Sequence, residues 1–384
     1  MDNLFFNDEH IMIRDMVREF ADSEITPVAQ ELDELGKFPR KLVDKMGELG
    51  LMGIMIPEEY GGAGLDMVAF ATAIMELGRA DASVAITMAA HSSLGSLPIL
   101  MFGSDEQKNT YLPKLATGEM LGAFGLTEPD AGSDAGATKT KAVRDGDEYI
   151  VNGGKIFITN VGEAGVLSFT SLVVENGKNL GIAAFTIPTD TPGLEIGPKE
   201  KKMGWRASDT RQLFFKDMCI PTSSILGTPG DGFKTFMKTL TSGRVSIGAL
   251  SVGTAVGAYE RALAYSAERV AFGKPINKFQ SVGFKLADMA TKIEASKLLV
   301  FHAAWMKDQG LDITKEAAMA KLFASETAME VTTEAIQVHG GYGYVREYDV
   351  ERFFRDAKIL EIGEGTSEIQ RLIISREILK DIQI

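Results

Sequence analysis

The sequence has 384 residues, of which 45% are hydrophobic and 24% charged, and its formal net charge is −13. A single core of ordinary size does not accommodate that length, so two or three packed units are expected. An acidic surface repels nucleic acid and anionic membranes, so neither is an expected partner. With Cys219 as the only cysteine, an internal disulfide is excluded and a cysteine-based metal site is disfavoured.

The chain begins with the acidic segment MDNLFFNDEH, which lacks the basic-then-apolar order of a signal peptide. The longest apolar run that we identify, residues 51–57, is interrupted by Gly53, so no membrane insertion is expected. These features favour a soluble protein of a reducing compartment, and the expected location is cytoplasmic.

The first third of the chain is predicted to be helical. Apolar residues recur at three- and four-residue spacing from Ile13 to Ala21, after a capping candidate at Asn7 or Asp8. The segment PEEYGGAG (57–64) interrupts the helices, because its proline and glycines break a helix. Further helices are expected at residues 41–49, 67–77, 83–102 and 105–112.

The middle third changes to strand-forming sequence. YIVNGGKIFITN (149–160) and SLVVENGKNLGIAAFTIP (171–188) each place β-rich runs on either side of an Asn-Gly pair, which predicts two β-hairpins. QLFFKDMCIP (212–221) predicts a further strand. Little helical sequence lies between these strands, so we expect an antiparallel sheet or barrel.

From Gly232 onward the sequence is helical again, with long segments rich in Ala, Leu, Met and Lys at 233–269, 281–309 and 314–339. Together with a shorter helix after Ser367 they predict a four-helix bundle. The expected fold is therefore an α+β multi-domain arrangement. It comprises an N-terminal helical domain (1–122), a central antiparallel β-barrel (123–228) and a C-terminal four-helix bundle (229–384).

Several common kinds of catalytic site have no support in the sequence. It contains no G-x-x-x-x-G-K-[ST] phosphate loop, no H-E-x-x-H and no G-x-S-x-G elbow. The four histidines are scattered, so a three-ligand zinc site is not expected.

Four glycine- and hydroxyl-rich loops remain as candidates, each with an ordinary structural alternative. FGLTEPDAGSD (124–134) could hold a phosphate or a polar heterocycle, or could simply connect domains. Phe157 in FITN (157–160) suits packing against a flat ring, but core packing is the commoner role. RVAFGKP (269–275) is typical of a basic helix C-cap. QVHGGYGY (337–344) has three glycines, of which a C-cap explains one.

The segment GEGTSEIQR (363–371) places Glu364 between two glycines, just ahead of a helix that Thr366 or Ser367 can cap. By itself this segment is compatible with a solvated surface acid as well as with a catalytic one.

Seven segments, taken together, resemble the flavin-dependent acyl-CoA dehydrogenases over essentially the whole chain. They occur in that family's order at plausible separations, and seven in register are hard to attribute to chance. The segments are PEEYGGAG, FGLTEPDAGSDAG, KIFITN, KMGWRASDTRQLFF, RVAFGKPINKFQ, QVHGGYGY and EIGEGTSEIQR. The family's architecture of helical domain, β-barrel and four-helix bundle agrees with the fold predicted above.

The resemblance implies that Glu364 is the catalytic base. In the family this acid removes a proton from C2 of an acyl-CoA while hydride leaves C3 for N5 of FAD, giving a trans-2-enoyl-CoA. The backbone N–H of the base and a flavin hydroxyl stabilise the developing enolate. Burial should raise the pKa of Glu364 towards neutrality. Some relatives carry the base on another helix, where this chain has Gly243 in TSGR (241–244).

The resemblance also implies which residues bind FAD and substrate. The residues expected to contact FAD are Phe124, Leu126, Thr127, Ser133, Phe157, Ile158, Thr159, Phe272, Thr366, Ser367 and Glu368. Those expected to reach the flavin of a neighbouring subunit are Arg269, Gln280, Gln337, Val338, His339, Gly340 and Gly341. Those expected at the substrate are Ser133, near the pantetheine, Arg244, at the CoA end, and Thr241, Ser242, Gly243 and Gly365. FITN departs from the family's commoner tryptophan, which weakens the case for flavin stacking at Phe157.

The resemblance further implies an electron-transferring flavoprotein as electron acceptor and a homo-oligomer, expected to be a tetramer. Ala85 stands where relatives acting on glutaryl-CoA have an arginine, and Gly363 stands where a tyrosine is often found. These two positions favour an uncharged short- or medium-chain acyl group, with branched or alicyclic groups open. Two alternatives remain: an acyl-CoA oxidase, although oxidases of this kind tend to be longer, and a non-catalytic flavin-binding scaffold.

Overall fold

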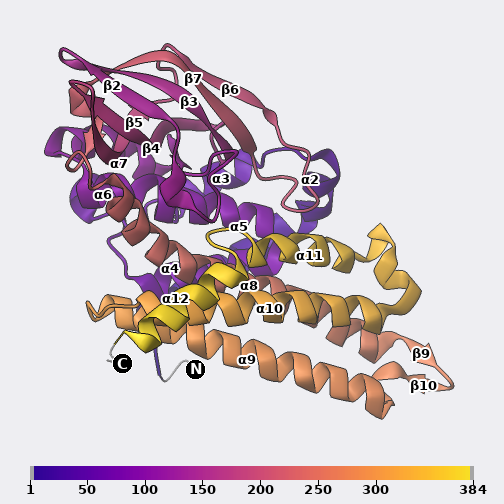
Figure 1. Cartoon of the computed structure of the whole chain (residues 1–384). Helices are drawn as coiled ribbons and strands as arrows, with labels where there is room; N and C mark the ends of the chain where they lie inside the picture. The colour runs from indigo at the N-terminus through magenta and orange to yellow at the C-terminus, as the bar shows by residue number, and fades with distance from the viewer. Residues whose placement is uncertain (1–3, 381–384) are drawn as a thin grey trace.

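A computed structural model of the chain describes residues 4–380. It shows an N-terminal helical unit, a β unit and a C-terminal unit of long helices, as the sequence predicts (Figure 1). The first unit begins at a well-formed cap, since the Asn7 side chain accepts from the His10 N–H and the His10 ring accepts from the Asn7 N–H. Its helices are α1 (Asp8–Phe20), α2 (Ala29–Leu35), α3 (Arg40–Glu48), α4 (Met67–Ala80), α5 (Ala82–Ala89), α6 (Leu97–Phe102) and α7 (Asp105–Thr117).

Helices α5 and α6 are joined by a π-helical segment, Ala90–Ser96. The run Ala82–Phe102 is long and apolar enough to cross a membrane, which corrects the expectation that no segment approaches that length. It is nevertheless 78% buried inside the protein. His91 within it donates from Nε2 to the Leu115 carbonyl and accepts from the Gly122 N–H. The run therefore lies in the core of the protein.

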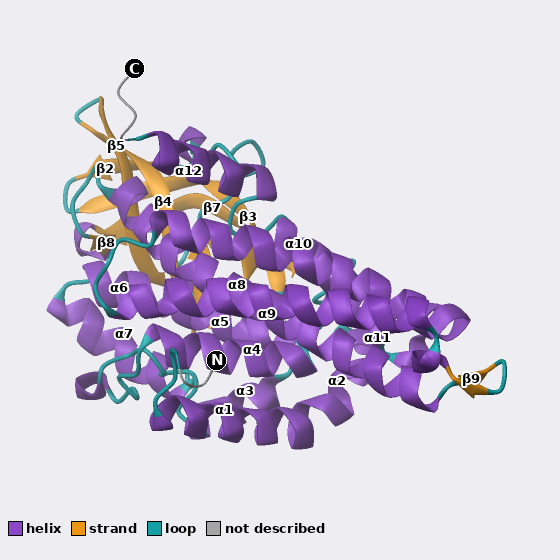
Figure 2. Ribbon diagram, turned by 90° about the horizontal axis from the view of Figure 1, so that it is seen from below, coloured by secondary structure: helices purple, strands orange, loops and turns teal. Residues whose placement is uncertain are grey.

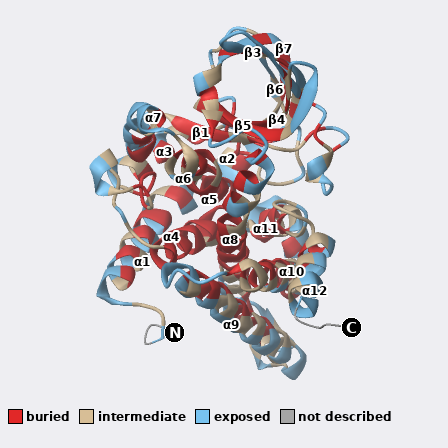
Figure 3. Cartoon of the chain, turned by 60° about the vertical axis from the view of Figure 1, so that its left-hand side comes forward, coloured by how far each residue is buried: buried red, intermediate tan, exposed pale blue. Residues whose placement is uncertain are grey.

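The β unit is a curved eight-stranded sheet with the order β6-β7-β3-β2-β4-β5-β8, in which β1 pairs with β4 (Figure 3). Most pairs are antiparallel, as expected, but β1 and β2 each run parallel to β4. The strands are β1 (Leu121–Gly125), β2 (Lys141–Asp145), β3 (Glu148–Thr159), β4 (Ala164–Glu175), β5 (Lys178–Pro188), β6 (Leu194–Lys199), β7 (Thr210–Pro221) and β8 (Ile225–Leu226).

One of the two predicted hairpins is wrong. Asn176-Gly177 forms the expected turn between β4 and β5, with positive φ at both residues. Asn152-Gly153, in contrast, lies inside the continuous strand β3, where Gly153 has a φ of 143° and the pairing with β7 shifts register. Asn152-Gly153 therefore forms a bulge and not a turn.

The C-terminal unit contains the four expected helices and one more. The third long helix, α10, has the predicted bounds, and the helix after the Glu364 segment is also present. The elements are α8 (Gly232–Glu268), β9 (Val270–Ala271), β10 (Lys274–Pro275), α9 (Gln280–Asp308), α10 (Thr314–His339), α11 (Val350–Ala357) and α12 (Ser367–Leu379). The β9–β10 hairpin projects from the far end of the bundle (Figure 2).

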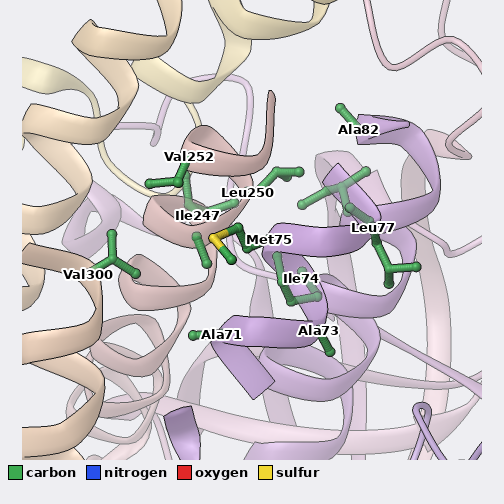
Figure 4. Close-up of a cluster of buried hydrophobic side chains, with 14 of the residues drawn as sticks. Ala71, Ala73, Ile74, Met75, Leu77, Ala82, Ile247, Leu250, Val252 and Val300 are labelled. Carbon is green, nitrogen blue, oxygen red and sulfur yellow. The ribbon is translucent and has the colours of Figure 1, made fainter. Parts of the chain in front are cut away.

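The N-terminal and C-terminal helical units share one apolar core. Side chains of α4, such as Ile74 and Met75, pack against Ile247 and Leu250 of α8 (Figure 4). A Cβ added at Gly253 of α8 would lie 2.2 Å from the Met75 carbonyl oxygen, so this glycine permits close helix packing. This shared core holds α8 and α10 rigidly beneath the loop that carries Glu364.

Candidate active site

Glu364 lies on a tight turn between a 3₁₀ segment, Lys358–Glu361, and α12. Its φ of 52° and the φ of 95° at Gly365 both fall in the left-handed region. That conformation is costly for a glutamate, so the surrounding structure must impose it. Thr366 ends the turn by capping α12, because its hydroxyl accepts from the Ile369 N–H at 3.3 Å.

Two buried side chains hold this turn from outside it. Gln370 on α12 donates from Nε2 to the carbonyl oxygens of Glu364 at 3.2 Å and Gly365 at 2.9 Å. Lys321 on α10 donates from Nζ to the Gly365 carbonyl oxygen at 2.8 Å. The backbone N–H of Glu364 makes no hydrogen bond to any residue in the range 4–380, so it is available to a ligand.

The Glu364 carboxylate is directed at Gly243 of α8. A Cβ added at Gly243 would lie 2.1 Å from Glu364 Oε2 and 3.4 Å from Leu94 Cδ2 in the π-helical segment. Glycine at this position therefore makes room for the carboxylate, besides being unable to act as a base itself. Oε2 is buried and has no hydrogen-bond partner among the described residues.

Burial raises the pKa of Glu364 to about 7, and the positive charges of Arg244 and Lys321 oppose that rise. Arg244 is itself buried, its Nε has no partner among residues 4–380, and its Nη1 donates to the Thr241 hydroxyl at 3.4 Å. The structure thus places Arg244 within electrostatic reach of Glu364. The hydroxyl of Ser242 is likewise buried and unpartnered within that range. Unsatisfied polar groups on both sides of a carboxylate are typical of a site that binds a polar ligand.

The loop after β1 is fixed by a buried ion pair between Lys155 of β3 and Glu128. Lys155 Nζ donates to Glu128 Oε1 at 2.7 Å, to the Leu126 carbonyl at 3.1 Å and to the Thr170 hydroxyl. Glu128 in turn accepts from the backbone N–H groups of residues 139 and 140. The Thr127 carbonyl accepts from the Ile156 N–H, so the two predicted flavin segments lie side by side.

At the end of β3, Phe157 has a φ of 58° at a shift in the pairing with β7, and its side chain is 63% exposed. The alternative of Phe157 as a core residue is therefore wrong, whereas Ile158 is buried. The Asn160 Nδ2 donates to the Thr87 carbonyl of α5, but its Oδ1 is buried without a partner in the described chain. The Asn160 N–H donates to the Asp209 carbonyl oxygen. The hydroxyl of Ser208, the residue before Asp209, is also buried without a partner in the described chain.

The Glu364 turn with α8 forms one half of the site, and the loop after β1 with the end of β3 forms the other. The two halves meet at the π-helical segment Ala90–Ser96. The backbone of Gly95 approaches that of Gly122 at the start of β1 so closely that a Cβ on Gly95 would lie 2.6 Å from the Gly122 carbonyl carbon. Phe124, two residues on, stacks on Phe236 of α8 with ring centroids 4.1 Å apart. Phe236 is about two helical turns from Gly243. The structure therefore brings Phe124–Thr127, Phe157–Thr159 and the Glu364 turn to one region.

The predicted neighbour-facing residues form a second, distant cluster. Arg269, Val338, His339, Gly340 and Gly341 line a cavity of about 790 Å³ with Tyr265 and Tyr348. Phe272, at the tip of the β9–β10 hairpin, is 95% exposed, and Gln280 and Gln337 are exposed as well. Lys321 and Gln337 are sixteen positions apart on α10, a span of about 24 Å at the helical rise.

The remaining predicted site residues differ in how far they are exposed. Ser133 lies exposed on the loop before β2, Glu368 is exposed on the first turn of α12, and Ser367 is buried with an unpartnered hydroxyl within the range 4–380. The sequence reasoning missed Lys321, Leu94 and the Lys155–Glu128 pair. Only Lys321 had a usable signal, since it falls on the buried stripe of α10 together with Ala317, Ala324 and Ala328.

Comparison with known proteins agrees with this geometry. Family models for the N-terminal, middle and C-terminal domains of acyl-CoA dehydrogenase match residues 7–119, 123–218 and 230–379. The chain belongs to the acyl-CoA dehydrogenase family. It is 52% identical over 380 residues to the probable acyl-CoA dehydrogenase YngJ of Bacillus subtilis, covering 98% of this chain and 100% of that one. It is 47% identical to the short-chain specific acyl-CoA dehydrogenase of Clostridium acetobutylicum, covering 97% of this chain and 98% of that one.

Solved structures of the acyl-CoA dehydrogenase family show the same fold. Butyryl-CoA dehydrogenase from Megasphaera elsdenii has a TM-score of 0.94 at 44% identity, covering 97% of this chain and 98% of that one. A chain solved in work on the electron transferring flavoprotein of Acidaminococcus fermentans has a TM-score of 0.95 at 48% identity, covering 98% and 99%. Acyl-CoA dehydrogenase complexed with FAD from Bacillus anthracis has a TM-score of 0.92 at 38% identity, covering 98% and 67%.

The expected fold, enzyme class and cofactor are confirmed: the chain is an acyl-CoA dehydrogenase, an oxidoreductase that uses FAD. The residues present fit that cofactor. Phe157 has an exposed aromatic side chain, and Asn160, three residues on, and Ser208 carry buried polar atoms without a partner among the described residues. An exposed ring and an unpartnered polar atom in one segment suit a flat heterocycle with a polar edge. The ordered loop of residues 126–140 lies beside this segment.

Proposed function

We propose that this acyl-CoA dehydrogenase oxidises short-chain acyl-CoA thioesters to trans-2-enoyl-CoA with Glu364 as the base that removes the C2 proton. FAD, when bound, accepts the hydride that leaves C3. Glu364 receives the C2 proton on its carboxylate, and its backbone N–H donates a hydrogen bond to the thioester oxygen as enolate charge develops there. The left-handed turn presents both groups from one residue.

The observation that carries this proposal is the state of the Glu364 carboxylate. Its Oε2 is buried and has no hydrogen-bond partner among the described residues, and the pKa of Glu364 is raised to about 7. A general base works best with a pKa near the operating pH, because it is then both deprotonated and basic. A surface acid would have neither property, and a non-catalytic scaffold would have no use for them.

Replacing Glu364 by glutamine tests this role. Glutamine keeps the size and the backbone N–H but removes the proton acceptor, so FAD content should be unchanged. Anaerobic reduction of the flavin by butyryl-CoA should slow at least about 10²-fold. The exposed Glu294 on α9, which belongs to no predicted site, supplies the control, since Glu294→Gln should leave that rate unchanged. Near-normal reduction in Glu364→Gln would move the base to another residue.

We propose an uncharged, short acyl chain as the substrate. Relatives named as short-chain specific and butyryl-CoA dehydrogenases support the length. The run Ala82–Phe102 contains no lysine or arginine. Its one titratable side chain, His91, is held neutral because burial lowers its pKa to about 4. Ala85 is fully buried among apolar residues.

Branched or alicyclic chains belong to this proposal through Gly363. A Cβ there would meet nothing within 4 Å except the Ile359 carbonyl oxygen at 3.4 Å, so the position has room that a larger residue would fill. Flavin reduction rates with butyryl-, isovaleryl- and cyclohexanecarboxyl-CoA measure this directly. If Gly363→Tyr left the isovaleryl-to-butyryl rate ratio unchanged, residue 363 would have no part in selecting the acyl group.

We propose an electron-transferring flavoprotein as the electron acceptor, supported by the likeness to a chain from the Acidaminococcus fermentans work. Reduction of such a flavoprotein with butyryl-CoA, without oxygen consumption, is the expected result. Rapid hydrogen peroxide formation would favour the oxidase alternative. The cytoplasmic location stays a prediction.

We also propose that the active form is a homo-oligomer, with a tetramer as the expected state. The predicted neighbour-facing cluster at Arg269 and Gln337–Gly341 lies about 24 Å along α10 from the Glu364 turn. Two clusters so far apart are readily explained if each serves a different flavin. A fully active monomer in light scattering at assay concentration would contradict this proposal.

A further inference from the structure

Lys321 is a fully buried lysine in the middle of the C-terminal bundle. It lies on the inward stripe of α10 whose other members, including Ala317, Ala324 and Ala328, are small and apolar. Helix packing does not need a charge at this position. Burying an ammonium group there is costly unless a partner or a function offsets the cost.

Lys321 contacts the turn that carries Glu364. Its Nζ donates to the Gly365 carbonyl oxygen at 2.8 Å, and this is the one hydrogen bond that Nζ makes within residues 4–380. The same carbonyl accepts from Gln370 Nε2 at 2.9 Å. This double clamp from α10 and α12 fixes the peptide that joins Gly365 to Thr366. Gln370 also holds the carbonyl of the preceding peptide, at Glu364, at 3.2 Å, so the two left-handed residues are restrained together.

Four other charged groups act on Lys321. Burial lowers its pKa to about 8, the carboxylates of Glu364, Glu361 and Glu326 oppose this, and Arg244 on α8 adds to it. Lys321 in turn is one of the two cations that restrain the pKa of Glu364, Arg244 being the first. The lysine therefore couples to the base both through the backbone and through charge.

We propose that Lys321 is a positioning residue for proton removal, which clamps the turn through the Gly365 carbonyl and keeps the Glu364 carboxylate ionised and aimed at the substrate. This inference rests on the proposed role of Glu364 as the base. It assigns a function to a residue whose one hydrogen bond within residues 4–380 is to the backbone of the turn.

Lys321→Met removes the charge and the hydrogen bond but keeps an unbranched side chain of similar length. The expected result is a fall in kcat of about tenfold or more with a small change in KM, because orientation of the base and not substrate binding is lost. The acidic limb of the kcat/KM profile should move to higher pH, since the pKa of Glu364 rises when a cation is removed. Backbone amides of residues 361–370 should exchange with deuterium faster, which is a readout independent of turnover.

Two further variants separate the parts of the role. Gln370→Leu removes the second clamp without changing charge, so it should speed amide exchange and lower kcat while leaving the acidic limb in place. Lys292→Met is the control: this exposed lysine of α9 pairs with Glu330, and its loss should alter none of the three readouts.

The inference is overturned if Lys321→Met lowers only the melting temperature and leaves kcat, the acidic limb and amide exchange as in the wild type. If Lys321→Met does not fold, Gln370→Leu decides, and normal kcat with normal exchange in that variant overturns the clamp. Failure of the proposed function is a different result, because it appears as a wild-type flavin that butyryl-CoA does not reduce or as an active Glu364→Gln variant.

Discussion

Replacing Gly243 by alanine is expected to disable the base while leaving the fold intact. The added methyl group would lie 2.1 Å from Glu364 Oε2 and 3.0 Å from its Cδ. Because ordinary contacts between such atoms are roughly 3.5 Å, the carboxylate must move by about 1 Å or more. It is the far end of a flexible side chain, so it can move at little energetic cost.

The rate of flavin reduction should therefore fall while the stability of the fold is kept. Displacement of a catalytic group by about 1 Å can cost about 10²-fold in rate, which is about 2.7 kcal/mol of transition-state stabilisation. Alanine in the interior of α8 should meanwhile gain up to about 1 kcal/mol of helix propensity over glycine. We expect slow anaerobic flavin reduction by butyryl-CoA together with an unchanged or raised melting temperature.

A matched substitution controls for the change of glycine to alanine itself. Gly283 lies in α9, and a Cβ there would meet only the Asn277 carbonyl oxygen, at 3.8 Å. Gly283→Ala should therefore keep full activity. If Gly243→Ala reduced its flavin at the wild-type rate, the carboxylate would not occupy the position beside Gly243 from which the reasoning starts.

Three further outcomes are expected. The kcat/KM for butyryl-CoA should rise with pH through an apparent pKa near 7, because Glu364 must lose its proton to act; a limb near pH 4.5 would mean that the free carboxyl is not desolvated. Lys155→Met should release FAD on dilution more readily than the wild type, because it leaves Glu128 buried without its cation and loosens the loop of residues 126–140. The control is Lys216→Met, which removes an exposed ion pair between β7 and Glu195 of β6. Equal FAD retention in the two variants would refute the reasoning. Glutaryl-CoA should give a kcat/KM far below that of butyryl-CoA, since an unpaired carboxylate near Ala85 would cost several kcal/mol; glutaryl-CoA as the best substrate would contradict it.

Much of the fold was predictable because its long elements carry strong periodic signals. The expected range of α10, residues 314–339, is the observed one, and α1 begins at the expected cap Asn7. The error at Asn152-Gly153 has a physical cause. Strand β3 pairs with β2 on one side and β7 on the other, and these two ladders keep the strand continuous where the local sequence would turn. The second Asn-Gly pair, Asn176-Gly177, lies outside such ladders and turns as expected.

The parallel pairing of β1 and β2 with β4 could not be predicted from the sequence, for a related reason. Strand alternation reports which face is buried and carries no information on the direction of a partner that is distant in sequence. The helices α2 and α11 were missed because they have only seven and eight residues, too few for a periodic pattern to stand out.

The flanking residues and the family resemblance made Glu364 a candidate base, but the residues that support its turn were not predicted. Glycines beside an acid signal an unusual backbone, and Glu364 indeed has a left-handed φ. Lys321, in contrast, has only its place on the apolar stripe of α10 as a sign of burial in the sequence, and Lys155 has no such sign. Their partners, Gly365 and Glu128, lie 44 and 27 residues away, and only the folded chain brings them together.

Helix α10 links the two clusters of functional residues in one rigid element. Near its N-terminal end Lys321 supports the Glu364 turn, and its C-terminal end carries Gln337–Gly341, predicted for a neighbouring flavin. Its inward stripe is Ala-rich, which allows close approach to α8. Because helices packed so closely shift as units, the spacing of the base from the neighbour-facing cluster is fixed by the bundle. In the proposed oligomer, the same packing would then set the base in one subunit's site and the cofactor contacts in the next.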